Sequence, residues 1–167
     1  MSTQTPWLSA TEEHLWRTWT QLNGELSATL QREMQGDANL SLSDYEVLVH
    51  LTDSPEGRVR VSDLARLLQW ERSRVSHHLT RMERRGLVQR SECAEDGRGA
   101  FISVTTTGRA ANEQAAPGHV AAVRRLVFDA LDENDVSGLS VALDKMLARL
   151  HDVPDGGMST RAAVQAT

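Results

Sequence analysis

Apolar residues recur every three or four positions along the first part of the chain, which is the spacing of amphipathic helices. The pattern predicts a long first helix over 12–34. A second helix follows, opened by Ser41 or Ser43, both of which are good N-caps. A short third helix is expected from Ser62, where the Ser-Asp sequence is typical of a helix N-terminus.

The period then changes twice in the middle of the chain. After a break at 69–71, helical spacing returns over 72–85 and stops at Gly86, a residue that commonly ends helices. Between Leu87 and Thr105 the pattern is that of two short strands. They are joined by the loop AEDGRGA, whose two glycines suit a hairpin.

The C-terminal part is predicted to be helical again. One helix starts at Thr105 and is expected to be kinked or interrupted near Pro117-Gly118. The last helix reaches Leu150 and can be capped by Asp132 with Asp135. The predicted fold class is therefore mainly α with a small antiparallel sheet of two to three strands.

Composition places the chain among ordinary globular proteins, with 40% hydrophobic and 25% charged residues in 167 positions. A single cysteine, Cys93, rules out an intrachain disulfide and fits a reducing cytoplasm. No apolar run is long enough for a transmembrane helix, and the N-terminus lacks the pattern of a secretory signal. We therefore expect a cytoplasmic protein that does not engage a membrane.

Charge is distributed unevenly along the chain. The whole chain has a formal net charge of −5, yet the span 58–98 contains ten arginines and only six acidic residues. A basic island in an acidic body indicates a local surface for a polyanion. A solvated helix whose charges pair internally is the alternative interpretation of this feature.

A helical projection of 72–85 separates two kinds of residue. At about 100° per residue, one stripe carries polar and basic side chains, with His78, Arg81 and Arg85 within about 40° of Arg74. Ser73, His77 and Arg84 extend this stripe, and an apolar stripe lies beside it: Val75, Leu79 and Met82. The apolar stripe is expected to pack on the body, so that the basic stripe faces outward.

A short helix, a tight turn and a helix with an outward basic stripe form the helix-turn-helix pattern. Its second helix enters the major groove of DNA. The candidates for base and nearby phosphate contacts are Ser73, Arg74, Ser76, His77, His78 and Arg81. Arg84, Arg85 and Arg90 are either phosphate contacts or internal ion pairs. Ser62, at the start of the preceding helix, is a candidate phosphate ligand.

The hairpin makes this a winged helix-turn-helix. Arg98 lies between two glycines at the tip, where a long cation can reach into a minor groove. Asp96 is expected to orient it. Cys93, at the end of the first wing strand, is interpreted as an ordinary strand residue.

The stretch LARLLQWERSRVSHHLTRMERRGLVQRSECAEDGRGAFISVTTTGR resembles the MarR family of bacterial winged-helix transcriptional regulators. The resemblance covers roughly 40–109. It implies that the first and last helices intertwine two subunits, that the dimer binds a near-palindromic operator, usually as a repressor, and that small anionic or aromatic ligands release it. The regions would be a dimerisation helix (1–36), a winged helix-turn-helix (37–109), C-terminal dimerisation helices (110–151) and a tail (152–167).

The family arrangement also implies a ligand pocket between the dimer helices and the winged domain. The residues that could line it here are His14, Trp16, Arg17, Trp19 and Tyr45. Arg17 would be the partner of a ligand carboxylate, although aromatic residues at helical spacing more often form a core or a dimer interface.

Catalysis and cofactors are not expected. The chain has no nucleophile elbow, phosphate-binding glycine loop or zinc-protease motif. The pair His77-His78 lacks a third metal ligand at helical spacing, so no metal site is predicted. The rival to DNA binding is a winged helix that binds another protein instead. The basic island favours DNA.

Overall fold

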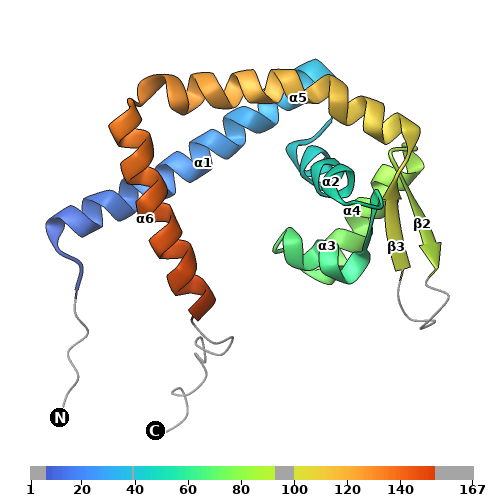
Figure 1. Cartoon of the computed structure of the whole chain (residues 1–167), viewed down its shortest axis with the longest axis horizontal. Coiled ribbons are helices and arrows are strands. Elements are labelled where there is room, and N and C mark those ends of the chain that lie inside the picture. The colour runs from blue at the N-terminus through green and yellow to red at the C-terminus, as the bar shows by residue number, and fades with distance from the viewer. Residues whose placement is uncertain (1–6, 39, 93–99, 153–167) are drawn as a thin grey trace, which may run out of the picture. The chain divides into compact units, whose positions relative to one another are not determined.

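The computed structural model describes residues 7–38, 40–92 and 100–152, and the predicted fold class is confirmed (Figure 1). The elements are α1 (Ala10–Ala38), α2 (Leu42–Asp53), β1 (Arg58–Arg60), α3 (Val61–Leu67), α4 (Arg72–Arg84), β2 (Val88–Glu92), β3 (Ala100–Val104), α5 (Thr106–Leu126), a 3₁₀ turn (Phe128–Ala130) and α6 (Glu133–Asp152). The chain divides into two compact units, Met1–Arg124 and Arg125–Thr167. No helix in the described ranges is long and apolar enough to cross a membrane.

Reciprocal side-chain caps start three of the helices. Ser41 opens α2, with its hydroxyl accepting from the Asp44 amide (3.0 Å) and the Asp44 carboxylate accepting from the Ser41 amide (2.9 Å). Ser9 and Glu12 form the same arrangement before α1. Asp132 and Asp135 do so before α6, as predicted.

One expectation about the helices is wrong. α3 begins at Val61, directly after β1, and its N-cap Arg60 makes no capping bond, so Ser62 lies inside the first turn. The strand β1 leads directly into the helix, so the residue before α3 is the last residue of a strand and not a polar cap. α5 continues through Pro117, so of the two outcomes expected near Pro117-Gly118 the helix is not interrupted there.

The sheet has three antiparallel strands in the order β1-β3-β2. β1 adds a strand to the hairpin of β2 and β3: its Val59 pairs with Ile102 of β3. On its other side, β3 pairs with β2 along its length. Ile102 is fully buried, so the middle strand joins the wing to the core. The core is formed by residues of α2, α3, α4 and the sheet: Val47, Leu48, Leu51, Leu64, Val75, Leu79, Met82, Val88 and Ile102.

The turn between α3 and α4 and the end of α4 follow the predicted breaks. Gln69 has a left-handed φ of 54°, and its side-chain amide donates to the Arg66 carbonyl at 3.0 Å. Gly86 ends α4 with a φ of 71°, a conformation that glycine adopts without steric cost. Both positions are outside the helices that the sequence pattern indicates.

α5 closely approaches the backbone of the segment between α4 and β2. Thr105 caps α5 by accepting from the Gly108 amide at 3.0 Å, and its hydroxyl lies 2.6 Å from the Gly86 carbonyl oxygen. A Cβ at Gly108 would lie 1.9 Å from the Leu87 carbonyl oxygen. Only glycine therefore fits at this crossing.

Gly108→Ala should lower the free energy of unfolding by about 3 kcal/mol, because the methyl group meets backbone that belongs to the core. Urea unfolding measures the loss. Gly24→Ala is the matched control: nothing lies within 4 Å of its Cβ position in the exposed part of α1, so stability should rise by about 0.5–1 kcal/mol. Equal effects of the two substitutions would contradict this packing.

Candidate nucleic-acid interface

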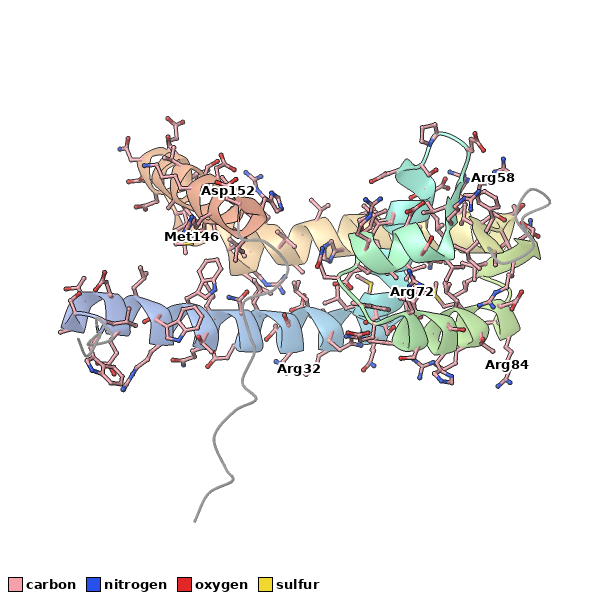
Figure 2. The ribbon with its side chains drawn as sticks, turned by 90° about the horizontal axis from the view of Figure 1, so that it is seen from below. Arg32, Arg58, Arg72, Arg84, Met146 and Asp152 are labelled. Carbon is pink, nitrogen blue, oxygen red and sulfur yellow. The ribbon has the colours of Figure 1, made fainter. Side chains whose placement is uncertain are left out.

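α4 has one face in the core and one in solvent. Val75, Leu79 and Met82 are fully buried, as the helical projection predicts. The exposed side chains along α4 include Ser73, Arg74, His77, Arg81 and Arg84, whereas Ser76 is half-buried. Figure 2 labels Arg72 and Arg84 at the two ends of this helix. An arginine- and histidine-bearing face on a helix held by its apolar side suits a groove lined by phosphates.

His78 does not belong to this exposed face, and its placement as an outward DNA contact is wrong. The residue is only 7% exposed. Its Nε2 lies 3.0 Å from Oδ1 of Asp44, in α2. Angular position on a single helix could not reveal a buried partner on another helix, and that partner draws the imidazole inward.

Asp44 connects α2 with two turns of α4. Besides His78, Asp44 contacts Arg85, whose Nη1 donates a hydrogen bond to Oδ2 at 2.7 Å. Burial raises the pKa of the Asp44 carboxyl, but the contact with His78 and the hydrogen bonds from the Ser41 amide and Arg85 outweigh it and hold that pKa far below its usual value. Of the two roles left open for Arg85, the structure shows the internal ion pair.

Arg81 is held by the other nitrogen of the same imidazole. Its Nη2 lies 3.0 Å from Nδ1 of His78. A guanidinium only donates, so Nδ1 must accept and His78 is the neutral tautomer that carries its proton on Nε2. Nε2 lies 3.0 Å from the Asp44 carboxylate, an electrostatic contact whose angle does not meet the geometry of a hydrogen bond. Arg81 itself remains exposed and available to a phosphate.

Arg74 is also held in place, by an aromatic ring. Its guanidinium carbon lies 4.1 Å from the ring centroid of Trp70, in the turn before α4. The Trp70 ring in turn meets the His78 ring edge-on, with centroids 5.3 Å apart. This stacking restricts Arg74 and leaves its exposed nitrogens free to donate.

Other basic residues sit at the edges of this surface. Ser62 is exposed on α3 beside Asp63 and lines an open depression with Arg72 at the start of α4. Two arginines of β1, which the sequence reasoning missed, flank one aromatic ring: the guanidinium carbons of Arg58 and Arg60 lie 4.8 Å and 5.2 Å from the centroid of Phe101. The sequence signal that could have revealed this pair is the spacing of Arg58 and Arg60, two positions apart on a strand.

The wing tip lies beyond the described residues. Asp96, Arg98 and Cys93 fall in the range 93–99, so the structure does not test their expected roles. Arg90, on β2, is exposed, and its backbone amide donates to Glu83 at 3.2 Å.

The residues predicted to line a ligand pocket are not brought together. A hollow of about 350 Å³ lies among α1, α2 and α5, and Tyr45 lines it with Leu26, Leu30, His50 and His119. His14, Trp16, Arg17 and Trp19 are not part of that lining. Arg17 pairs with Glu13 on the same exposed helix face.

His119 gives this hollow a polar group. Its ring lies 4.7 Å from the Tyr45 ring, centroid to centroid, and its Nδ1 is buried with no hydrogen-bond partner among the described residues. Burial lowers the pKa of His119 more than nearby Glu46 raises it, which favours the neutral ring. No group of three metal-ligating side chains occurs in the described ranges.

The depressed pKa of Asp44 predicts a specific loss of stability in acid. The unfolded carboxyl titrates near pH 3.9 and the folded one well below it, so its stabilising effect is complete above about pH 5 and is lost as the pH falls. Asp44→Asn should be about 3 kcal/mol less stable at pH 7 and should lose less stability between pH 5 and pH 3 than the unsubstituted chain. Urea unfolding at each pH tests this, and parallel curves would contradict it.

Comparisons with known proteins agree with this architecture. The family model described as MarR family matches residues 38–99. AbsC, a MarR family transcriptional regulator from Streptomyces coelicolor, is 41% identical; the match covers 89% of this chain and all of that one, with a TM-score of 0.82. Sco3205 from the same organism, solved in complex with DNA, is 35% identical, with 92% and 96% coverage and a TM-score of 0.83.

A curated relative was also found. The HTH-type transcriptional repressor YetL of Bacillus subtilis is 30% identical over 94 residues, and the match spans 56% of each chain. The match to AbsC extends over that regulator's full length, beyond the winged region to the flanking helices. The chain belongs to the MarR family of transcriptional regulators.

Proposed function

We propose that the chain is a transcriptional repressor that binds a near-palindromic operator as a homodimer and is released by a small ligand. The observation that carries the proposal is the exposed face of α4, where Ser73, Arg74, His77 and Arg81 project from a helix fixed by a buried core. A 35% identical relative was solved with DNA, and a 30% identical one is named a repressor.

The contacts are expected to divide by position along α4. The N-terminal part of a recognition helix reaches base edges deepest, so Ser73, Arg74 and His77 would read sequence. Arg81 and Ser76 would contact nearby phosphates, and Ser62 would add a phosphate contact from α3. Beyond the described residues, Arg98 is proposed for the minor groove, with Asp96 orienting it.

Dimerisation is proposed from apolar surface that one subunit leaves exposed. In α1, Leu15, Trp16 and Leu22 are more than half exposed. In α6 no residue is buried, although Leu147 and Leu150 belong to its apolar stripe. Contiguous apolar faces of this kind mark association surfaces, and a second copy presents the same faces.

The effector is proposed to be a small aromatic molecule with a hydroxyl group. The hollow among α1, α2 and α5 has the size of a small-molecule site, about 350 Å³. Tyr45 offers a ring face, and the unpartnered Nδ1 of His119 can accept a hydrogen bond. Arg17 is not part of the lining, which favours an aromatic ligand over the anionic alternative.

The rival proposal, a winged helix that binds protein and not DNA, differs in its response to salt. Neutralised phosphates release counterions, so the logarithm of affinity for duplex DNA should fall linearly and steeply with the logarithm of salt concentration. Duplex binding that is absent, or insensitive to salt, would favour the protein-interaction module.

Arg74 and Arg84 provide a matched pair of substitutions on one helix. Arg74→Ala should cost about 1–3 kcal/mol on the cognate duplex and much less on random DNA, because a base contact is lost. Arg84→Ala, at the far end of α4, should weaken cognate and random DNA by similar factors, or have little effect. Binding is measured at one fixed salt concentration. An equal loss for Arg74→Ala on both duplexes would make it a phosphate contact.

His119→Leu should weaken binding of 1-naphthol, an aromatic hydroxyl probe, by about fivefold, because a buried hydrogen-bonding group is removed. Quenching of the probe's fluorescence measures the affinity. Arg17→Gln is the control and should bind the probe as the unsubstituted chain does. A loss in Arg17→Gln with none in His119→Leu would place the ligand elsewhere on α1.

A further inference from the structure

We infer that His78 and Asp44 are positioning residues for DNA recognition: they set the rotation of α4 and hold Arg74 and Arg81 in fixed directions. This inference rests on the proposed function. It concerns buried side chains that do not touch DNA, so it goes beyond the contacts assigned above.

The rotation of α4 is fixed because two of its residues meet one carboxylate. His78 and Arg85 are seven positions apart, which returns to nearly the same side of a helix after two turns. Their nitrogens lie 3.0 Å and 2.7 Å from the two oxygens of Asp44. A rotation or a slide of α4 would break at least one of these contacts and leave a buried carboxylate with fewer donors around it.

The carboxylate is itself held by the start of α2. Asp44 is 4% exposed and accepts from the Ser41 amide at 2.9 Å, within the capping box. A negative charge in the first turn of a helix is also stabilised by the helix dipole. The reference point for α4 is therefore the N-terminus of a core helix, which is a rigid anchor.

His78 links Asp44 to both Arg81 and Arg74. Its Nδ1 accepts from Arg81 at 3.0 Å, and its ring meets the edge of Trp70, over which Arg74 stacks at 4.1 Å. Arg81 and Arg74 are thus each oriented through the imidazole, one by a hydrogen bond and the other by ring packing. Holding both in advance reduces the ordering cost of binding and penalises wrong bases.

Two substitutions of His78 distinguish the contribution of its polar contacts from the contribution of its side-chain volume. The amide of His78→Gln can donate to Asp44 and accept from Arg81, whereas His78→Leu fills the space without either contact. His78→Leu should lower the ratio of affinities for the cognate duplex and a singly substituted duplex by about tenfold, the value of one base contact. Its affinity for random DNA should change less than about twofold, because no charge that faces phosphates is removed. His78→Gln should retain most of the discrimination.

Val47→Ala is the control for stability alone, because Val47 is fully buried in the same helix as Asp44 and takes no part in the bridge. It should lower the free energy of unfolding and leave discrimination unchanged. The inference is overturned if His78→Leu discriminates as the unsubstituted chain does, if His78→Gln fails as His78→Leu does, or if Val47→Ala loses as much discrimination.

A measurement without DNA separates this inference from the proposed function. Nitrogen-15 NMR of the full chain should show His78 with an unprotonated Nδ1 and a protonated Nε2 at neutral pH. A proton on Nδ1 would overturn the bridge. The expected tautomer, in a chain that discriminates no duplex from another, would instead refute the proposed function and leave the bridge intact.

Discussion

The arrangement of the winged region depends on one buried carboxylate. Asp44 joins the first turn of α2 to two turns of α4, and it does so with three donors of different kinds: a backbone amide, an imidazole and a guanidinium. Burying a carboxylate costs free energy unless such donors surround it. This cost disfavours any arrangement in which the donors have moved away from it. The core beneath α4 supplies most of the stabilisation through apolar burial, which is non-directional. The contacts of the carboxylate are directional, so they fix the rotation of α4, which apolar packing alone does not.

Much of this fold could be predicted from local pattern. The cap at Ser41, the break before α4 and the end of α4 at Gly86 all follow from residue types whose backbone preferences act within a few positions. The start of α3 could not be predicted in this way. There the chain enters the helix directly from β1, and β1 exists because Val59 pairs with Ile102, more than forty positions later.

The same distinction between local pattern and long-range contact applies to the candidate site. The helical projection separated the buried stripe of α4 from the exposed one because period alone decides that. It misplaced His78, whose orientation is decided by Asp44 on another helix, and it left two roles open for Arg85 for the same reason. The hollow beside Tyr45 likewise needed three helices in place before His119 could be found in its lining. Chemistry that converges from distant segments is visible only after folding.

The account is tested most directly by selection of bound duplexes from a random pool, using the full chain. A dimer that presents two copies of α4 predicts one enriched, near-palindromic sequence with half-sites about 34–36 Å apart, one turn of DNA, centre to centre. Enrichment of no sequence, or of a single asymmetric site, would contradict the central claim that α4 reads an operator from each of two symmetric subunits.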